Sequence, residues 1–258
     1  MSLLFITGAS SGIGQALAQK YLSLGWKVAM VSRRVHDLEQ WCEHNSFSKN
    51  SYTIYEADVC DTASITNAGH LCLEQHGVPD IVIANAGISA GIDTAQLDDI
   101  GVMRKIYETN VIGMMATFQP FIEPLMQRKT GILVGIASVA GVRGLSGHGA
   151  YCSSKAAVIS YCESLRLEMR ETTGSNGVKV VTILPGFVDT PMTKENDFSM
   201  PFMLSTQEFA DKAVRAIGKE KSYAVIPWQM NIVARLMRIM PNILFDYLFS
   251  GRGRKKRL

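Results

Sequence analysis

The chain has 258 residues, of which 47% are hydrophobic and 19% charged, and its formal net charge is +3. This length fits one α/β domain, residues 1–258, because single domains of this size bury roughly 75% of their unfolded surface. Five positive charges lie in the last seven residues, so residues 1–251 carry −2, five below the total, which gives no reason to expect nucleic-acid binding.

The five cysteines are an odd number without a C-x-x-C pair. This pattern fits neither a disulfide framework nor a zinc site, so we expect reduced thiols. The five histidines show no paired ligand spacing either, so no metal site is expected. The N-terminus leads directly into a strand-like run, without the basic segment and long apolar stretch of a secretory signal, and a cytoplasmic protein is therefore expected.

Short β-rich apolar runs alternate along the chain with segments of helical period and length. Seven runs are predicted strands: Leu3–Thr7, Lys27–Ser32, Tyr52–Tyr55, Ile81–Ala84, Gly131–Ile136, Lys179–Leu184 and Tyr223–Ile226. The predicted helices between them include Gly12–Leu24, Asp98–Gln127 and Tyr151–Thr172. These helices are long enough for crossovers between parallel strands. We therefore predict a doubly wound α/β (Rossmann) domain with a seven-stranded parallel sheet flanked by helices.

Ser205-Thr206-Gln207-Glu208 has the spacing of a capping box, which predicts a helix from there to about Gly218. The preceding loop, Thr190–Leu204, is consequently long and rich in Met and Phe. It follows the C-terminal end of a strand, the edge at which ligands bind in such sheets. A substrate lid and a surface loop that packs on its own domain are equally compatible with this pattern.

Residues 227–250 form an apolar segment that precedes a basic tail, residues 251–258. Arg235, Arg238 and Pro241 interrupt it, so no run reaches the ~18 uncharged apolar residues that a membrane span needs. Two short amphipathic helices separated at Pro241 are predicted. They could cover a substrate pocket, form a subunit contact, or lie on an anionic membrane as a peripheral attachment.

A glycine-rich turn, Thr7–Gly14, follows the first predicted strand with the spacing G-x-x-x-G-x-G. Without side chains at Gly8, Gly12 and Gly14, the backbone can approach a pyrophosphate and the helix N–H groups can point at it. An ordinary glycine-rich turn between strand and helix is the alternative if this motif stands alone.

Tyr151 and Lys155 lie four residues apart and thirteen residues after Ser138, so the first two share a helix face. Lowering the pKa of a phenol from about 10 to near 7 takes roughly 4 kcal/mol of preferential stabilisation of the phenolate. A cation about 4 Å away supplies about 4 kcal/mol at an effective dielectric constant of about 20. We expect Lys155 to lower the pKa of Tyr151, and Tyr151 to act as general acid in reduction and general base in oxidation.

The ordered set Thr7–Gly14, Asn85-Ala86-Gly87, Asn110, Ser138 and Tyr151-x-x-x-Lys155 resembles the classical short-chain dehydrogenase/reductase family, over about residues 3–226. Pro185–Thr190 is similar to the family segment that holds the nicotinamide carboxamide. The resemblance implies an NAD(P)(H)-dependent oxidoreductase that transfers a hydride between nicotinamide C4 and a carbonyl or secondary alcohol carbon. The family often has a second asparagine where Ala84 stands.

The resemblance also implies the roles of individual residues. Ser138 would hydrogen-bond the substrate carbonyl oxygen, Lys155 would also hold the nicotinamide ribose, and the backbone of Asn110 would hold a water in a proton relay. The expected catalytic residues are Asn110, Ser138, Tyr151 and Lys155. The expected cofactor-binding residues are Gly8, Ser10, Ser11, Gly12, Ile13, Gly14, Ser32, Arg33, Arg34, Asp58, Val59, Asn85, Ala86, Gly87, Tyr151, Lys155, Pro185, Gly186, Val188 and Thr190.

The choice of dinucleotide is made near the end of the second predicted strand, where a carboxylate would bind the ribose diol of NAD. The residues there are Ser32, Arg33 and Arg34. A carboxylate would repel a 2′-phosphate, whereas a guanidinium offers donors that match its oxygens, so NADP(H) is favoured over NAD(H). The alternative is that Arg33 and Arg34 are a solvated pair that opens the next helix.

The apolar Thr190–Leu204 loop favours a hydrophobic carbonyl or alcohol substrate, and family habit favours a homodimer or homotetramer. Two other functions are weighed. An extended-type nucleotide-sugar epimerase shares Tyr-x-x-x-Lys, but the glycine spacing and the short C-terminal region argue against it. A non-catalytic NADP(H)-binding regulatory protein would be expected to have lost part of the Ser/Tyr/Lys set, and this chain has all three.

Overall fold

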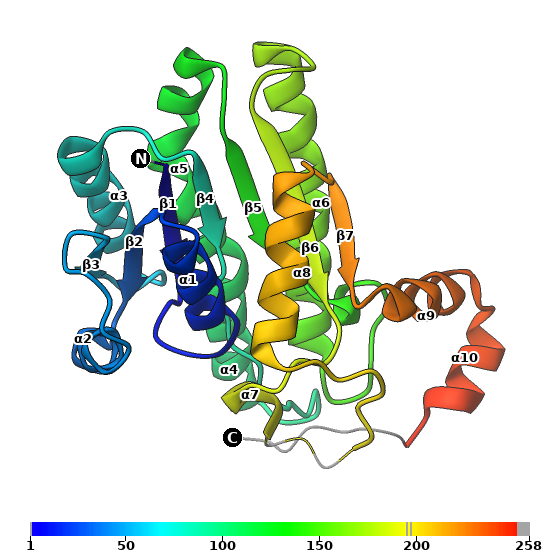
Figure 1. Cartoon of the computed structure of the whole chain (residues 1–258). Helices are drawn as coiled ribbons and strands as arrows, with labels where there is room; N and C mark the ends of the chain where they lie inside the picture. The colour runs from blue at the N-terminus through cyan, green and yellow to red at the C-terminus, as the bar shows by residue number, and fades with distance from the viewer. Residues whose placement is uncertain (1, 195, 197, 252–258) are drawn as a thin grey trace.

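The computed structural model describes residues 2–194, 196 and 198–251 (Figure 1). Within these residues a seven-stranded parallel sheet has the order β3-β2-β1-β4-β5-β6-β7. The chain builds outward from β1 to β3, then crosses to β4 and builds the other way, so the order reverses between β1 and β4. The predicted sheet is confirmed. Its strands are β1 Leu3–Thr7, β2 Lys27–Ser32, β3 Tyr52–Glu56, β4 Ile81–Ala84, β5 Ile132–Ile136, β6 Lys179–Pro185 and β7 Tyr223–Ile226.

Alternate side chains of each central strand enter different cores, because successive residues of a strand point to opposite faces of the sheet. In β1, Leu3 and Phe5 belong to one core, and Leu4 and Ile6 to the other. Both faces are therefore apolar, and the strand sequence is a continuous apolar run.

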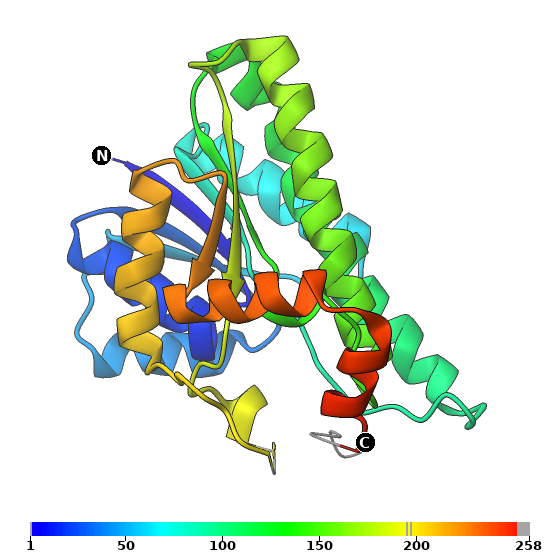
Figure 2. The same ribbon diagram turned by 90° about the vertical axis from the view of Figure 1, so that its right-hand side faces the viewer.

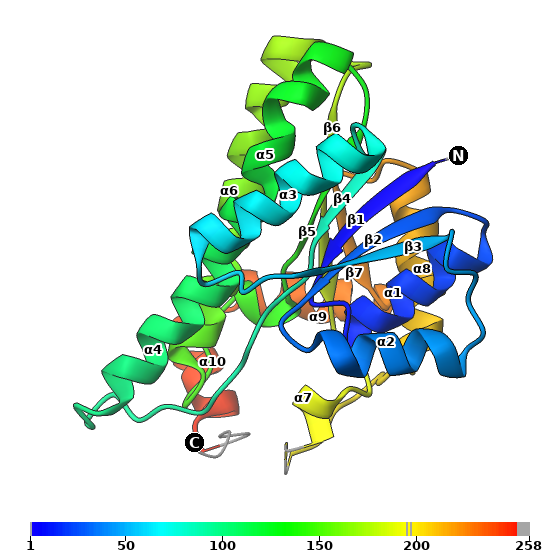
Figure 3. The ribbon, with the colours of Figure 1, turned by 90° about the vertical axis from the view of Figure 1, so that its left-hand side faces the viewer.

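Helices cover each face of the sheet, and Figure 3 shows the two layers on opposite sides of it. One layer supplies Ile65, Phe118 and Val158 to its core, and the other supplies Leu17 and Phe209. The first layer is α3 Thr62–His76, α5 Gly113–Arg128 and α6 Gly149–Thr173; the second is α1 Gly12–Ser23, α2 Val35–His44 and α8 Thr206–Gly218.

The prediction of one helix over Asp98–Gln127 is wrong in the middle of this segment. It consists of α4 Asp99–Tyr107, a π-helical turn Glu108–Ile112, and α5. A π turn inserts a residue without altering the apolar period enough to be seen in the sequence. Asn110 lies in this turn, and such turns occur frequently at functional sites.

The predicted capping box at the start of α8 is confirmed. The Ser205 hydroxyl accepts from the Glu208 amide at 3.2 Å, and the Glu208 carboxylate accepts from the Ser205 amide at 2.9 Å. The preceding loop contains a short helix, α7 Pro191–Lys194, and a bridge between Val188 and Leu204 closes its base. Residues 195 and 197 of this loop lie outside the described residues.

Two short helices follow β7, α9 Trp228–Ile239 and α10 Asn242–Phe249, and they separate at Pro241 as predicted. In Figure 2 both lie on the side of the molecule that faces the viewer. Across the described part of the chain, none of the helices combines the length and the apolar character needed to cross a membrane. Of the predicted basic tail, residues 252–258 lie outside the described residues.

Two helical glycines provide a matched test of the packing between α3 and α5. A Cβ on Gly69 would lie 2.7 Å from Cγ of Pro120, whereas a Cβ on Gly101 of α4 would meet nothing within 4 Å. We expect Gly69→Ala to lower the free energy of unfolding by about 1–3 kcal/mol through overpacking. Gly101→Ala should raise it by up to about 1 kcal/mol, because alanine favours a helix. Chemical denaturation measures both, and equal effects would contradict the close approach of the two helices.

Candidate active site

A cleft of about 460 Å³ opens at the carboxyl edge of the sheet, where the strand order reverses between β1 and β4. Of the predicted site residues, all but Gly14 and Asn110 line it. These are Gly8, Ser10, Ser11, Gly12, Ile13, Ser32, Arg33, Arg34, Asp58, Val59, Asn85, Ala86, Gly87, Ser138, Tyr151, Lys155, Pro185, Gly186, Val188 and Thr190. The fold therefore gathers residues from most of the chain around one cavity.

The glycine turn after β1 adopts backbone conformations that favour glycine. The φ angles of Gly8 and Gly12 are +68° and +57°. Gly14 lies behind the cleft, where a Cβ would fall against the Gly8 carbonyl oxygen and 2.5 Å from the Asn85 amide nitrogen. The missing side chain at Gly14 thus lets α1 pack directly on the turn.

Hydrogen bonds fix this turn to the end of β4. The Asn85 side-chain amide donates to the carbonyl oxygens of Thr7 (3.0 Å) and Gly8 (3.3 Å). The Thr7 hydroxyl accepts from the backbone amides of Asn85 (3.2 Å) and Ala86 (3.3 Å). The two strands on either side of the reversal point are held together at the floor of the cleft.

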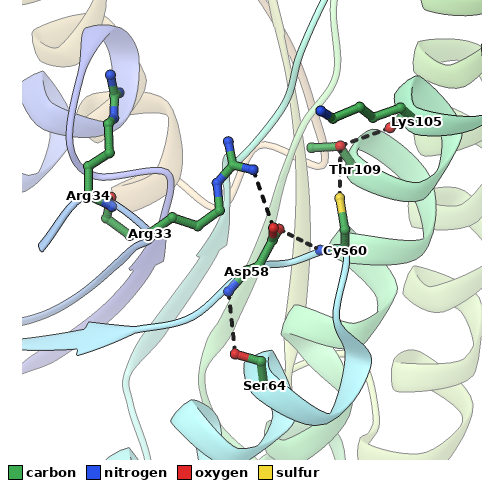
Figure 4. A network of polar contacts seen from close by, with 8 residues as sticks. Arg33, Arg34, Asp58, Cys60, Ser64, Lys105 and Thr109 are labelled. Atoms are coloured by element: carbon green, nitrogen blue, oxygen red, sulfur yellow. Dashed lines mark hydrogen bonds and ion pairs between the residues drawn. The ribbon is translucent and has the colours of Figure 1, made fainter. Parts of the chain in front are cut away.

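Two guanidinium groups lie at one end of the cleft, and Figure 4 shows Arg33 and Arg34 extending from the end of β2. Arg34 Nη2 donates to the hydroxyls of Ser10 and Ser11, each at 3.1 Å, so it reaches the glycine turn. Arg33 Nη1 lies 3.2 Å from Asp58 Oδ2. Both side chains are about 60% exposed, so these contacts add little stability and leave the groups available to a ligand.

Asp58, which follows β3, contacts Arg33 and the backbone amide of Cys60 (Figure 4). Burial alone would raise the pKa of this carboxyl, but the Cys60 amide (3.0 Å) and the neighbouring Arg33 outweigh that effect and lower it. The Cys60 sulfur lies 3.1 Å from the Thr109 hydroxyl, which donates to the Lys105 carbonyl oxygen at 2.8 Å. Lys105 and Thr109 also line the cleft, and nothing in the sequence pattern had indicated them.

Asn110 is 1% exposed and braces the chain beside the cleft. Its side-chain oxygen accepts from the Ile88 amide at 2.8 Å, and its amide donates to the Ile88 carbonyl oxygen at 2.9 Å and to the Ser154 hydroxyl at 3.0 Å. The side chain thereby joins the segment after β4 to α6. Its predicted part in a water relay stays a prediction.

Ser138, Tyr151 and Lys155 all line the cleft; the spacing had predicted a shared helix face for the last two, and the family resemblance had implied the place of Ser138. Lys155 is 5% exposed; its ammonium donates to the Ile136 carbonyl oxygen at 2.8 Å and lies 5.9 Å from the centre of the Tyr151 ring. Burial lowers the pKa of Lys155 to about 8.

The pKa of Tyr151 is not lowered by the protein's own groups. Burial raises it, and the nearby Ser138 hydroxyl acts in the opposite direction with a smaller effect. The expectation that the Lys155 ammonium lowers this pKa is therefore wrong for the protein alone. The physical reason is that desolvation of a partly buried phenol disfavours its charged form more than the surroundings favour it.

Close backbone approaches fix the relative positions of these three side chains. A Cβ on Gly141 would lie 2.7 Å from the carbonyl carbon of Lys155, so the turn that carries Ser138 rests directly on α6. A Cβ on Gly87 would lie 3.4 Å from the Lys155 ammonium nitrogen. The Ser138 hydroxyl accepts from the Ala140 amide at 3.1 Å, which orients its oxygen.

A family model described as short chain dehydrogenase matches residues 2–200. The chain belongs to the short-chain dehydrogenase/reductase family. It is similar to an uncharacterized oxidoreductase of Myxococcus xanthus, with 36% identity over 242 residues that make up 93% of each chain.

Two solved structures share the fold of this short-chain dehydrogenase/reductase. One is a short chain dehydrogenase/reductase from Burkholderia phymatum in complex with NAD, with a TM-score of 0.81, 23% identity and coverage of 100% of this chain and 97% of that one. The other is an alcohol dehydrogenase from Thermococcus sibiricus complexed with 5-hydroxy-NADP, with a TM-score of 0.75, 24% identity and coverage of 88% and 96%. At these identities they establish the fold.

A second cavity of about 630 Å³ adjoins the cleft and shares six lining residues with it: Ser138, Tyr151, Pro185, Gly186, Met192 and Thr193. Most of the remaining wall of this pocket in the short-chain dehydrogenase/reductase is apolar. It comes from the segments after β5 and β6 and from the two C-terminal helices. Its members include Leu145, Phe187, Phe198, Pro201, Met230, Val233, Met237 and Phe249.

The Thr190–Leu204 loop and the C-terminal segment therefore both line a pocket next to Tyr151, as one of the alternatives for each had proposed. Among the described residues, no three His, Cys, Asp or Glu side chains are grouped so that they could hold a metal ion. His148, whose ring packs on Phe198 with centroids 6.0 Å apart, adds a polar group to the pocket wall.

Arg143 connects the turn after Ser138 to the C-terminal helices. Its guanidinium donates to the carbonyl oxygens of Met237 and Met240, each at 2.6 Å, and to the Asn242 side chain at 2.7 Å. It also lies 3.9 Å above the Phe245 ring, which stacks on Phe249 in the pocket wall. One side chain thus holds the end of α9, the start of α10 and an aromatic pair of α10.

We expect Arg143→Met to accelerate amide hydrogen exchange in residues 228–249 by at least about tenfold. Without the arginine, the free energy of local opening no longer includes the cost of breaking these charge-assisted hydrogen bonds. Arg143→Lys should restore little, since an ammonium cannot reproduce the planar fork of donors. Arg170→Met, at an exposed arginine of α6, is the control. Unchanged exchange in Arg143→Met would show that packing alone holds the two helices.

Proposed function

We propose that the protein is an NADP(H)-dependent oxidoreductase that transfers a hydride between nicotinamide C4 and the carbon of an apolar ketone or secondary alcohol. The observation that carries this proposal is that Ser138 and Tyr151 line both cavities at once. The cleft holds the glycine turn and two arginines, whereas the adjoining pocket is mostly apolar. A proton donor therefore lies at the junction of a dinucleotide site and an apolar substrate site.

In carbonyl reduction, Tyr151 gives its phenolic proton to the substrate oxygen while the carbon receives the hydride, so the product is a neutral alcohol. Burial raises the pKa of Tyr151, so the phenol is protonated in the protein without cofactor. NADP(H), when bound, supplies or accepts the hydride and, in its oxidised form, adds a positive charge that favours the phenolate in the reverse direction.

Ser138 orients the substrate oxygen. The Ser138 oxygen accepts from the Ala140 amide, and the hydroxyl retains one hydrogen to donate. It can donate to the carbonyl oxygen that Tyr151 protonates. Lys155, with a pKa of about 8, remains mainly charged at neutral pH and is buried beside Tyr151.

NADP(H) is preferred in this proposal because of the two exposed guanidinium groups at the end of the cleft. Arg34 already bridges to Ser10 and Ser11 in the glycine turn, and Arg33 lies beside Asp58. A 2′-phosphate placed between them would gain charge-assisted hydrogen bonds from fixed planar donors. The names of the similar structures include both NAD and NADP forms, so the arginines carry this argument.

The substrate class follows from the second cavity. Its volume of about 630 Å³ lies within the range of small-molecule sites, and its wall is mostly Phe, Met, Val and other apolar side chains, with Ser89, His148, Thr193, Asn196 and Ser199 as further polar members. We propose a hydrophobic substrate with one carbonyl or hydroxyl group. Polar recognition would then be concentrated at Ser138 and Tyr151.

The two other functions make different predictions. A regulatory protein that binds NADP(H) without turnover has no use for Ser138, Tyr151 and Lys155 lining one cleft beside an apolar pocket. An epimerase of nucleotide sugars regenerates its cofactor and needs a pocket that accepts a polar diphosphate and sugar. Net consumption of free NADPH with an apolar ketone distinguishes the proposed reductase from both.

Cytoplasmic location and assembly into a homodimer or homotetramer remain predictions. Sedimentation of the full chain measures the assembly directly.

Removing the phenolic proton tests the mechanism. We expect Tyr151→Phe to retain NADPH binding, measured by fluorescence, and to lose roughly 10²- to 10⁴-fold in turnover, measured by NADPH absorbance over a ketone panel. Tyr161→Phe, on the same helix but outside both cavities, should keep normal turnover. Activity retained in Tyr151→Phe would require another acid and would overturn the assignment.

The cofactor preference is tested separately. We expect Arg34→Ala to lower kcat/KM for NADPH by about 10- to 150-fold, because hydrogen bonds to a charged group contribute about 1.5–3 kcal/mol, and to change kcat/KM for NADH little. Arg104→Ala, an exposed position of α4 that does not line the cleft, is the control. Equal losses with both cofactors would contradict recognition of a 2′-phosphate by Arg34.

A further inference from the structure

Helix α9 is apolar on two opposite faces. Met230, Ala234 and Met237 are buried against the protein. The outward face carries a second apolar stripe whose members repeat every three or four residues and share one side of the helix. The exposed fractions of its side chains are 67% for Trp228, 52% for Ile232, 53% for Leu236 and 77% for Ile239.

Helix α10 extends this outward stripe with Ile243, Leu244 and Tyr247, which are also exposed. Seven of the eighteen exposed large apolar side chains of the described residues thus fall within the twenty residues from Trp228 to Tyr247. Single exposed apolar residues are ordinary, but a concentration of this kind marks a surface that another body covers. Figure 2 shows α9 and α10 at the front of this side of the molecule, with no other element in front of them.

Basic residues outnumber acidic ones in the sequence of this segment and of the tail that follows it. Arg235 and Arg238 are exposed on α9 and border the stripe, and Arg238 makes a hydrogen bond of 3.4 Å to the Val142 carbonyl oxygen. In sequence, residues 227–258 contain seven Lys or Arg and one acidic residue, Asp246. A helix with an apolar face, basic borders and a basic continuation has the composition of one that lies in a membrane interface.

We propose that the outward face of α9 and α10 docks on an anionic lipid surface. The apolar stripe would enter the boundary between headgroups and acyl chains, while Arg235 and Arg238 would bind lipid phosphates. A second copy of the chain fits less well. A two-fold pair would bring the exposed Arg235 and Arg238 of the two copies together, and residues 227–251 contain one acidic residue, Asp246, to offset them.

The docking surface and the wall of the apolar pocket are opposite faces of the same helix. Met230, Val233 and Met237 line the pocket, whereas Ile232, Leu236 and Ile239 face outward. Docking would therefore bring the pocket wall close to the lipid bilayer, in which apolar molecules dissolve. This inference needs neither turnover nor bound cofactor, so its test is independent of the proposed reaction.

The test is flotation of the full chain with phosphatidylcholine vesicles that contain either no anionic lipid or about 30% phosphatidylglycerol. We expect the protein to float with the anionic vesicles, to bind the neutral ones much more weakly, and to dissociate as salt rises from about 0.05 to about 0.5 M. The triple variant Ile232→Gln/Leu236→Gln/Ile239→Gln should partition at least about tenfold less onto anionic vesicles.

A matched triple variant controls for the loss of exposed apolar surface in general. Leu97→Gln/Ile100→Gln/Leu167→Gln replaces side chains that are 81%, 52% and 51% exposed elsewhere on the molecule, and it should bind vesicles normally. Arg235→Gln/Arg238→Gln should weaken binding to anionic vesicles and leave neutral ones unaffected. This variant keeps the test decisive even if the apolar triple variant fails to fold.

Three outcomes would overturn the proposal. The first is equal binding of the unmodified chain to neutral and anionic vesicles at low salt. The second is an equal loss of binding in the two triple variants. The third is a change of the α9 triple variant from dimer to monomer in sedimentation with no change in flotation, which would assign this face to a second copy.

Discussion

The burial of one ammonium group determines how the site is arranged. Lys155 is 5% exposed, and its charge is held at the carboxyl end of β5 by the Ile136 carbonyl oxygen. A buried charge is costly unless it is hydrogen-bonded, so this contact fixes α6 to the sheet edge at one position along the helix. Tyr151, one turn earlier on the same face, then necessarily points into the cleft. The glycine at 141 is needed because a Cβ there would lie 2.7 Å from the carbonyl carbon of Lys155 and would push α6 away from the turn.

The reversal of strand order then divides the sheet edge into two environments. On one side are β1 and β2, whose ends bring the glycine turn and two guanidinium groups to the cleft. On the other side are β5 and β6, followed by Ser138 and by segments rich in Phe and Met. A long ligand with a phosphate at one end and a flat ring at the other matches this polarity. The junction of the two environments is where Ser138 and Tyr151 lie.

Features encoded locally were predictable from the sequence, and those that depend on distant contacts were not. The strands, the glycine turn, the capping box at Ser205 and the break at Pro241 each follow from neighbouring residues. The π turn at Asn110 does not, because it barely alters the apolar period. Arg143 was missed because its partners lie 94 to 99 residues away. The pKa of Tyr151 was mispredicted because helical spacing gives proximity to a charge but says nothing of burial.

The C-terminal helices explain why so apolar a segment is interrupted by arginines. A helix that only closed a pocket would need one apolar stripe, and Met230, Ala234 and Met237 supply it. The second stripe lowers the solubility of the protein unless another surface covers it, and closing the pocket does not explain why it is there. The family match ends at residue 200, before either helix begins, yet both helices contribute to the apolar pocket. The two helices therefore close the apolar pocket with one face and carry the exposed apolar surface on the other.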